Sequence, residues 1–476
     1  MTDLVVVGAG PFGLTVARVM AEQGRRVALV ERRAHVGGNA FSEPDETTGI
    51  EVHRYGAHIF HTSNQRVWGF LGRFTGWTPY LHRVFTVHSG EVFPLPVNLG
   101  TINQFFRTAL SPDEARALIR SQASSPAPDA VPLSPSPAAD AVPPGPGPAS
   151  DVVPPDPGPA SDVVSPGPGP ASDVVPPGPS PASPANSGQE SLSPSSSAPA
   201  TPASPGPAPP SSAGAASDSS PAAALADGGE SLDVKAVGMI GRPLYEAFIR
   251  EYTAKQWQVA PELLPGAVIS RLPVRYNYDA RYFSDPYQGL PVDGYAALWE
   301  KLADHPQIEV RLGEDFLADT PDGGLYTKAN CVGQVPVVFT GPIDRYFDYV
   351  CGELGWRTLD FVWDHPATGD FQGCPVMNYA DLAQPWTRII EFKHFHPERD
   401  YPADRTVIAR EFSRLAAMGD EPYYPVATPQ DRARLERYRE AAKAEPNVVF
   451  GGRLGRYQYL DMDMAIAAGL TTAAGL

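Results

Sequence analysis

The clearest chemistry in the sequence lies near its start, in three glycines spaced as GxGxxG and one acidic residue that follows them. The glycines are Gly8, Gly10 and Gly13, and the acid is Glu31. In such a pattern the first glycine permits a tight turn, the second lets the backbone approach a pyrophosphate, and the third allows close helix packing. A carboxylate at the following strand end accepts hydrogen bonds from ribose hydroxyls. These four residues therefore predict a dinucleotide-binding site.

The segments around these residues have the pattern needed to position them. Leu4–Val7 is a short apolar run typical of a strand buried on both faces, and Leu14–Glu22 has helical spacing and is followed by Gly24. Val27–Val30 predicts a second strand, which completes a βαβ unit. Because the acidic Glu31 disfavours a 2′-phosphate, the expected dinucleotide is FAD or NAD.

Two further segments bear on the cofactor, and the first of them favours FAD. Gly37 and Gly38 resemble the second glycine pair of flavoproteins in the glutathione-reductase-like class. Near the C-terminus, a predicted strand at 448–450 runs into Gly451-Gly452-Arg453, and residues 461–464 begin a helix rich in small side chains. In that class the last helix returns to the cofactor, where its N-terminus stabilises negative charge on the reduced flavin. The alternative is that the glycines and the helix cap of this C-terminal segment have only structural roles.

A proline-rich insert interrupts the chain. Of the 476 residues, 123–230 contain no Lys, Arg or aromatic residue and hold 29 of the 54 prolines. This composition predicts a disordered segment, partly polyproline II, that replaces a connection between helices at 112–120 and 233–250. A role as spacer or docking tail is the alternative. An 11-residue unit recurs in the insert at Asp129, Asp140, Asp151, Asp162 and Asp173. Stacking of these units into a solenoid is not expected, because each unit has too few apolar residues.

Charge, cysteine content and hydropathy exclude several classes of protein. The formal net charge is −17, of which −10 lies in the insert, and a mildly acidic body argues against a nucleic-acid partner. The three cysteines form no CxxC pair, which fits a reducing compartment. No run of eighteen apolar residues occurs, and the start of the chain lacks the features of a signal peptide. We expect a cytoplasmic protein with no membrane segment.

A series of short motifs continues on both sides of the insert. In their joint order they resemble the bacterial UDP-galactopyranose mutase family, and the resemblance covers nearly all of the 368 residues outside the insert. The motifs are HIFHT at 58–62, FPLPVNL at 93–99, YTAKQW at 252–257, RLPVR at 271–275, RYFSD at 281–285, YQG at 287–289, YFD at 346–348, TRIIE at 387–391, EPYYP at 421–425 and DMD at 461–463.

This resemblance implies an isomerase that interconverts UDP-galactopyranose and UDP-galactofuranose. FAD would be active in its reduced form, through a sugar adduct at flavin N5 and with no net redox change, and an external reductant and a homodimer are implied as partners. The implied fold is α/β, with a Rossmann-like FAD-binding domain, a helical domain and a mostly antiparallel sheet domain, all built from discontinuous segments. Their expected residues are 1–80, 288–340 and 430–476 for the FAD domain, 100–122 and 231–287 for the helical domain with a substrate lid, and 81–99 and 341–429 for the sheet domain.

The resemblance also assigns roles to individual residues. Arg275 and Arg388 are expected to contact the diphosphate, which suits the planar fork and permanent charge of arginine, and His61 is expected to lie against the flavin. Residues 271–285 would form the lid. The alternative for Arg275 is that it is a solvated charge on a loop. For the aromatic residues among the substrate residues that follow, the alternative is packing in the core. The implied substrate residues are Tyr252, Thr253, Trp257, Arg271, Tyr287, Asn378, Tyr424, Tyr459 and Asp461. The implied cofactor residues are Gly8, Gly10, Phe12, Gly13, Glu31, Arg32, Gly38, Asn39, His58, His61, Gly452, Arg453, Asp461 and Met462, and no metal site is expected.

The sequence departs from the family pattern at two positions, and other functions stay open. Gln258 stands where a glycine commonly follows the KQW motif, and Phe392 replaces a usual histidine. Both departures bear on substrate preference more than on reaction type, so a mutase for a deoxy or N-acetyl hexose is one alternative. A flavin amine oxidase or desaturase is another, although paired arginines and aromatic side chains argue against its apolar tunnel. The third is a non-catalytic scaffold that recruits partners through the insert.

Overall fold

The N-terminal segment forms the predicted βαβ unit. The computed structural model describes residues 2–123, 230–270, 272–318 and 324–476, so nearly all of the predicted insert lies outside the described residues. Strand β1 (Leu4–Val7) leads into helix α1 (Pro11–Glu22) and strand β2 (Val27–Glu31). The helix begins earlier than its apolar spacing predicts because proline is favoured in a first helical turn.

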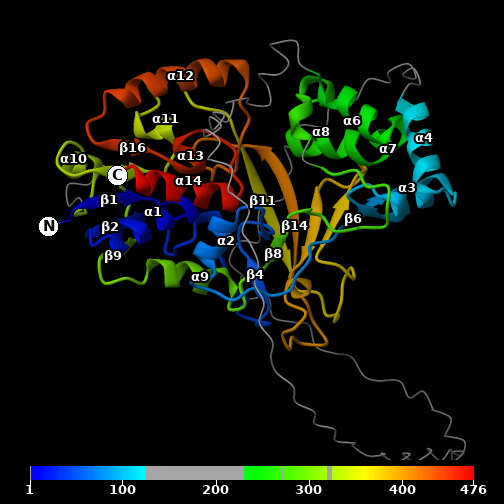
Figure 1. Cartoon of the computed structure of the whole chain (residues 1–476), viewed down its shortest axis with the longest axis horizontal. Coiled ribbons are helices and arrows are strands. Elements are labelled where there is room, and N and C mark those ends of the chain that lie inside the picture. Colours follow the sequence, from blue (N-terminus) through cyan, green and yellow to red (C-terminus); the bar gives the residue numbers. More distant parts are fainter. Residues whose placement is uncertain (1, 124–229, 271, 319–323) are drawn as a thin grey trace, which may run out of the picture. The chain divides into compact units, whose positions relative to one another are not determined.

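Strand β1 lies at the centre of a parallel sheet of five strands in the order β16-β10-β1-β2-β9 (Figure 1). Its side chains alternate between two separate cores, as expected for a strand buried on both faces. Leu4 and Val6 share a core with α1, whereas Val5 and Val7 share a second one with Phe339. The other strands of this sheet are β9 (Ile308–Leu312), β10 (Val337–Phe339) and β16 (Val448–Phe450).

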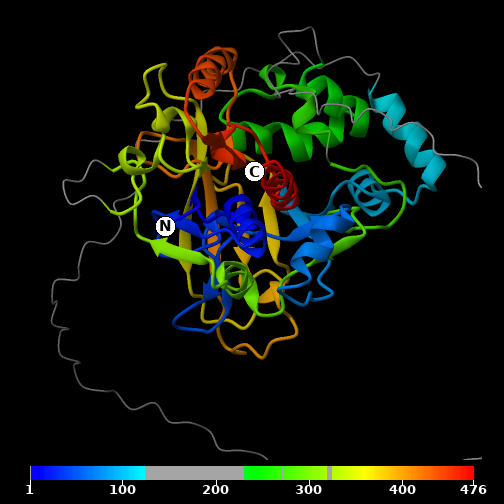
Figure 2. The same cartoon turned by 60° about the vertical axis from the view of Figure 1, so that its left-hand side comes forward.

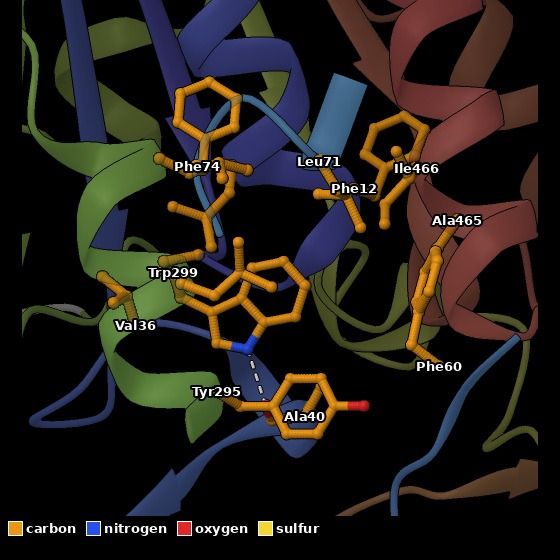
Figure 3. Close-up of a cluster of buried hydrophobic side chains, with 14 of the residues drawn as sticks. Phe12, Val36, Ala40, Phe60, Leu71, Phe74, Tyr295, Trp299, Ala465 and Ile466 are labelled. Atoms are coloured by element: carbon orange, nitrogen blue, oxygen red, sulfur yellow. Dashed lines mark hydrogen bonds between the residues drawn. The ribbon is translucent and has the colours of Figure 1, made fainter. Parts of the chain in front are cut away.

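The core beside α1 is organised around Trp299 of helix α9 (Gly294–Ala303) (Figure 3). The fully buried indole donates a hydrogen bond from Nε1 to the carbonyl of Ala40, at 2.6 Å. Gly37, the first glycine of the second pair, adopts a left-handed conformation with φ 97°, and a Cβ there would lie 2.3 Å from the indole Cδ1. Close approach of the tryptophan therefore requires glycine at this position.

A second sheet has seven strands in the order β15-β11-β14-β13-β12-β6-β7. All its neighbouring pairs are antiparallel except β12 with β6, which confirms the predicted mostly antiparallel sheet. The strands are β6 (Val84–His88), β7 (Glu91–Leu95), β11 (Trp356–Asp364), β12 (Val376–Tyr379), β13 (Arg388–Glu391), β14 (Ile408–Leu415) and β15 (Tyr424–Pro425).

The segments that precede and follow the insert in the sequence form a helical region with its own apolar core, which includes Ile102, Ile119 and Phe248. The helices predicted on the two sides of the insert are present, although Gly241 breaks the second of them. None of the described helices is long and apolar enough to cross a bilayer. The elements of this region are α3 (Leu99–Phe106), α4 (Pro112–Ala123), α6 (Leu232–Ile240), α7 (Arg242–Tyr245), the π-helical turn η2 (Glu246–Arg250) and α8 (Glu251–Trp257).

Shorter elements connect these parts. Two small antiparallel pairs, β3 with β4 and β5 with β8, lie between the larger elements in the sequence. The remaining elements are β3 (Ser42–Pro44), β4 (Glu51–His53), β5 (Phe60–Thr62), α2 (Gln65–Leu71), β8 (Tyr287–Gly289), α10 (Lys328–Cys331), α11 (Ile343–Tyr346), α12 (Pro429–Lys443), α13 (Gly452–Gly455) and α14 (Met462–Ala474).

Candidate active site

Helices α1 and α14 begin at the same end of the five-stranded sheet. They lie side by side (Figures 1 and 2), with Phe12 near Ile466 close to their starts (Figure 3). Just beyond their ends, Arg25 donates a hydrogen bond to the carbonyl of Leu476 at 2.8 Å, so the two helices run parallel. Neither helix has a side-chain hydrogen bond at its N-cap. The start of α1 has no acidic residue in its first turn and is therefore a partly positive end where an anionic group is stabilised, whereas the first turn of α14 carries Asp463.

The glycine turn before α1 leaves room on one side and none on the other. A Cβ at Gly10 would meet no atom within 4 Å, whereas a Cβ at Gly13 would lie 2.0 Å from the carbonyl oxygen of Gly8. A Cβ at Gly38 would lie 3.1 Å from Cα of Gly10, so the second glycine pair packs against the first. Phe12 is buried in the core, and only its backbone N–H is available to a ligand at the helix start.

The acidic end of β2 is held in a fixed orientation. Glu31 is buried, and its carboxylate accepts hydrogen bonds from the backbone N–H groups of Ala9, at 2.8 Å, and Arg33, at 2.9 Å. Its remaining lone pairs suit ribose hydroxyls. The open side of the glycine turn, the two helix starts and this carboxylate together fit a dinucleotide of the FAD type.

Arg33 lies beside this carboxylate, although the sequence pointed to its neighbour Arg32 and not to Arg33. Its Nη2 donates to the side-chain oxygen of Asn39 at 2.8 Å and to Glu421 at 2.7 Å, and its guanidinium stacks 4.4 Å from the ring of Tyr55. The Arg32 side chain is exposed and pairs with Glu421. The two arginines are adjacent in the sequence, and their contacts with Asn39 and Tyr55 distinguish them only in the folded chain.

A cavity of about 1220 Å³ brings together most of the predicted site residues. Arg275, Tyr287, Arg32 and the glycines of the dinucleotide turn are not part of its lining, and Arg271 lies outside the described residues. The predicted residues that do line it are Asn39, His58, His61, Tyr252, Thr253, Trp257, Asn378, Arg388, Tyr424, Arg453, Tyr459, Asp461 and Met462.

Arg388 is held at the cavity wall by two buried neighbours. Its Nε lies 3.0 Å from Oε1 of Glu411, and its Nη2 donates to the hydroxyl of Tyr252 at 3.1 Å. Although burial alone lowers the pKa of a guanidinium, the Glu411 carboxylate raises the pKa of Arg388 overall, so the group stays charged. Burial also raises the pKa of Tyr252 to about 12, which keeps its hydroxyl neutral. Glu411 was not among the residues predicted from the sequence, because it lies in no motif and only follows a strand pattern.

Helix α8 supplies one wall of the cavity. It follows the π-helical turn η2 directly, a feature common at functional sites, and presents Tyr252, Thr253, Gln256 and Trp257 to the cavity. Between them, Lys255 reaches away from the cavity to the loop that joins β12 and β13. Its ammonium group donates to the carbonyls of Tyr379 at 2.6 Å, Asp381 at 2.8 Å, Gln384 at 3.1 Å and Trp386 at 3.2 Å.

The C-terminal segment contributes a cation that lies beside two aromatic rings. The Arg453 guanidinium lies 5.1 Å from the ring of Tyr459 and 5.7 Å from that of Tyr424. The Tyr459 hydroxyl donates to Oδ1 of Asp461, the N-cap residue of α14, at 2.6 Å. These contacts bring the predicted cofactor and substrate residues of this segment into one cluster.

The histidines on the cavity wall differ in their surroundings. Nδ1 of His58 lies 2.7 Å from the carbonyl oxygen of Gly56, and burial lowers its pKa to about 4. Its imidazole is therefore neutral at pH 7, with Nδ1 as the donor and Nε2 as an acceptor. His61 pairs instead with Asp285, which also lines the cavity. Asp285 is the last residue of the RYFSD motif, but it was not among the predicted site residues.

Two residues predicted to meet the substrate lie elsewhere. Arg275 donates to the carbonyl of Arg281 and, at 2.7 Å, to Oγ of Ser284, so its own loop satisfies it. Tyr287 stacks on Trp68, with ring centroids 5.1 Å apart, as the core-packing alternative predicts.

The two departures from the family pattern also lie outside the cavity lining. Gln258 ends α8 in a left-handed conformation with φ 51°, and its Oε1 accepts a hydrogen bond from the buried Arg357 at 3.1 Å. Phe392 is fully buried and stacks on Trp363, with centroids 5.2 Å apart. Both side chains therefore contribute to packing outside the cavity lining.

The fold and the site together define an enzyme with a dinucleotide site of the flavin type. A family model described as an NAD(P)-binding Rossmann-like domain matches residues 6–74, and one described as UDP-galactopyranose mutase matches residues 247–459. A probable UDP-galactopyranose mutase of Klebsiella pneumoniae is 35% identical over 99% of this chain and 94% of its own length. The chain therefore belongs to the UDP-galactopyranose mutase family.

Two further comparisons bear on specificity and fold. A dTDP-fucopyranose mutase of Escherichia coli is 33% identical over 99% of this chain and 98% of its own length. A crystal structure of a reduced UDP-galactopyranose mutase matches 99% of this chain and 93% of that chain, with a TM-score of 0.59 and 12% identity, which supports the fold.

Proposed function

We propose that this protein interconverts UDP-galactopyranose and UDP-galactofuranose with FAD bound in its reduced form. The observation that carries the proposal is a single cavity lined both by Asn39, His58 and Met462, which are expected to hold the cofactor, and by Arg388, a partly buried cation suited to a diphosphate. Membership in the mutase family supports the same reading. The chemistry that reduced FAD supplies when bound is a nucleophilic nitrogen, with no net redox change.

The arginines bind and orient the diphosphate. Arg388 is already fixed by Glu411 and Tyr252, so little conformational entropy is lost when it pairs with a phosphate. Arg275 lies in a loop next to the cavity-lining Ser284, and a ligand anion would compete with its two hydrogen bonds there. In this proposal Arg275 is the arginine that moves, and residues 271–285 close over the substrate.

The aromatic wall orients the nucleotide and excludes water. Trp257 and Tyr252 of α8 supply flat apolar surface with polar edges, which suits a base and a sugar. Tyr424, Tyr459 and Arg453 form a second cluster on the cavity wall, and the Tyr459 hydroxyl is oriented by Asp461. A dry pocket protects a reactive sugar intermediate from hydrolysis and strengthens the pairing of cations with the leaving diphosphate.

The test is turnover of UDP-galactofuranose by purified protein, followed by chromatography. We expect a yellow protein that converts the sugar nucleotide after reduction with dithionite and is inactive when oxidised. The oxidised sample is the matched control. Equal turnover in both states, or a colourless protein that FAD does not reconstitute, contradicts the proposal.

A second candidate is a mutase for a dTDP-linked deoxy sugar, which the 33% identical dTDP-fucopyranose mutase favours. The same assay with dTDP-fucofuranose distinguishes the two, because pocket differences of one hydroxyl or methyl change kcat/KM by about 10- to 200-fold.

The remaining parts of the proposal follow the family resemblance. We propose a homodimer that receives electrons from an external reductant in the cytoplasm. The three cysteines are free, which fits a reducing compartment. Size-exclusion chromatography with light scattering measures the oligomeric state.

A further inference from the structure

One carboxylate contacts His61, the histidine expected beside the cofactor. Nδ1 of His61 lies 2.7 Å from Oδ2 of Asp285, and the two side chains are 19% and 30% exposed. The His61 ring also stacks on Phe283, with centroids 3.6 Å apart and an interplanar angle of 15°. His61, Asp285 and Phe283 all line the cavity. The carboxylate therefore restrains the His61 ring at its edge, and the stacked Phe283 restrains it on its face.

The backbone brings these two residues together. Strand β5 pairs antiparallel with β8, and His61 stands opposite Gln288. The Gln288 side chain donates from Nε2 to the carbonyl oxygen of Asp285 at 2.7 Å, which folds the segment before β8 back toward β5. The position of Asp285 is thus set by the pairing of β5 with β8 and by the hydrogen bond from the Gln288 side chain.

We propose that Asp285 is a positioning residue that holds His61 as the Nδ1–H tautomer and leaves Nε2 free for a ligand in the cavity. An ionised carboxylate only accepts hydrogen bonds, so Nδ1 must be the donor. His61 Nε2 has no hydrogen bond to any residue that the structure describes. A neutral His61 then presents an acceptor to the cavity, and a protonated one presents a donor. For the reaction itself, this inference rests on the proposed function.

The same segment links His61 to the proposed mobile arginine. Arg275 donates to Oγ of Ser284, the residue immediately before Asp285. The orientation of His61 therefore depends on the segment that carries Arg275, and movement of that arginine to a diphosphate releases a hydrogen bond next to Asp285.

The experiment compares Asp285→Asn with Asp293→Asn in the full-length, FAD-loaded protein. Asp293 is exposed outside the cavity and pairs with Lys301 at 2.9 Å, so its variant controls for loss of a carboxylate on the following segment. We expect Asp285→Asn to lose about 10- to 100-fold in kcat, with KM within about threefold, as for other partners that orient a histidine. Asp293→Asn should match wild type. A His61→Gln/Asp285→Asn double variant should be no slower than His61→Gln alone, because the carboxylate acts through the imidazole.

A second readout does not depend on turnover. Histidine ¹⁵N spectra at about pH 9, where an imidazole is ordinarily neutral, should show His61 protonated at Nδ1 in wild type but not in Asp285→Asn. The His61 signal is assigned by its absence in His61→Gln. A wild-type His61 protonated at Nε2, wild-type kcat in Asp285→Asn, or independent losses in the double variant would each overturn the inference. If reduced wild-type protein turns over neither UDP- nor dTDP-sugar, the proposed function fails, whereas the tautomer measurement still decides the role of Asp285.

Discussion

Arg388 and Glu411 stand directly opposite each other on strands β13 and β14, with Nε and Oε1 3.0 Å apart. The carboxylate is 5% exposed and the guanidinium 25%, so the acid is buried beneath the cation that lines the cavity. Thr387, the residue before the arginine, donates to the same oxygen at 3.0 Å. The adjacent strands thus hold the proposed diphosphate-binding cation in place.

Replacing either partner should reduce turnover. We expect Arg388→Ala to lose most activity and Arg388→Lys a substantial part, because a point charge does not reproduce the planar fork. Glu411→Gln leaves the cation without its counter-charge and should cost about 1–3 kcal/mol of stability as well as activity. Steady-state kinetics and urea unfolding measure both effects. Glu440→Gln, which removes an exposed acid paired with Lys443, is the control, and wild-type rates in Arg388→Ala would refute the diphosphate assignment.

Gly10 and Gly13 should respond differently to the same substitution. Gly10 has φ −74° and open space where a Cβ would lie, so Gly10→Val should fold but retain little FAD because the side chain occupies the pyrophosphate position. Gly13→Val should fail to fold, since its Cβ would lie 2.0 Å from a backbone oxygen. Glu31→Ala should also weaken FAD retention. Flavin absorbance and circular dichroism separate the two outcomes, and full FAD occupancy in Gly10→Val contradicts the assignment.

Acid should destabilise the protein through His82. Burial, together with the nearby Arg388 cation, lowers the pKa of this histidine to about 3. In the unfolded chain a histidine titrates near its ordinary pKa of about 6.5, so below that pH the unfolded state takes up a proton that the folded state refuses. Stability should therefore fall from about pH 6.5 toward pH 3, by at most about 1.4 kcal/mol per pH unit from this group.

Urea unfolding at pH 7 and pH 5 checks this slope. His82→Gln should reduce the loss between the two pH values, because the substituted side chain takes up no proton in either state. An identical loss in wild type and His82→Gln would show that other groups carry the acid sensitivity.

Gln258→Gly should destabilise the protein, although glycine is the usual family residue. The change relieves a left-handed conformation that costs a side chain about 1–2 kcal/mol. It also removes the acceptor for Arg357, which is 1% exposed, and a hydrogen bond to a charged group contributes about 1.5–3 kcal/mol. We expect a net loss of about 1 kcal/mol in urea unfolding, with Arg357→Met/Gln258→Gly as the matched variant that no longer needs the acceptor. A Gln258→Gly protein more stable than wild type contradicts this account.

Removal of the insert should leave folding, FAD binding and activity nearly intact. Helix α4 ends at Ala123, and the carbonyl of Glu230 accepts a hydrogen bond from Gly266 at 2.9 Å, so residues 124–229 are the ones to replace with a short Gly/Ser linker. Shorter loop closure should favour folding by about 2 kcal/mol at most. Urea unfolding with flavin fluorescence, together with turnover, is the measurement. A trimmed protein that binds FAD but loses more than about tenfold in rate shows that the insert takes part in the reaction.

Local patterns were enough to predict the parts of this protein that depend on neighbours in the chain. The βαβ unit follows from an apolar run, a GxGxxG turn and helical spacing, all within the first 31 residues. The helices beside the insert and the small-residue helix at the C-terminus follow from periodicity in the same way. The motifs on both sides of the insert also identified the family, because their joint order along the chain is specific to it.

Contacts between distant segments were decided only by the tertiary structure. Glu411 meets Arg388 because the consecutive strands β13 and β14 pair in a particular register, and Asp285 meets His61 because β8 pairs with β5, which lies far from it in the sequence. Tyr287 carries a motif yet packs on Trp68. A side chain's partner depends on which strand lies beside it and on which face it points to, and a one-residue shift of register would change both. Spacing along the chain does not contain that information, so the residues that orient the site emerged only from the fold.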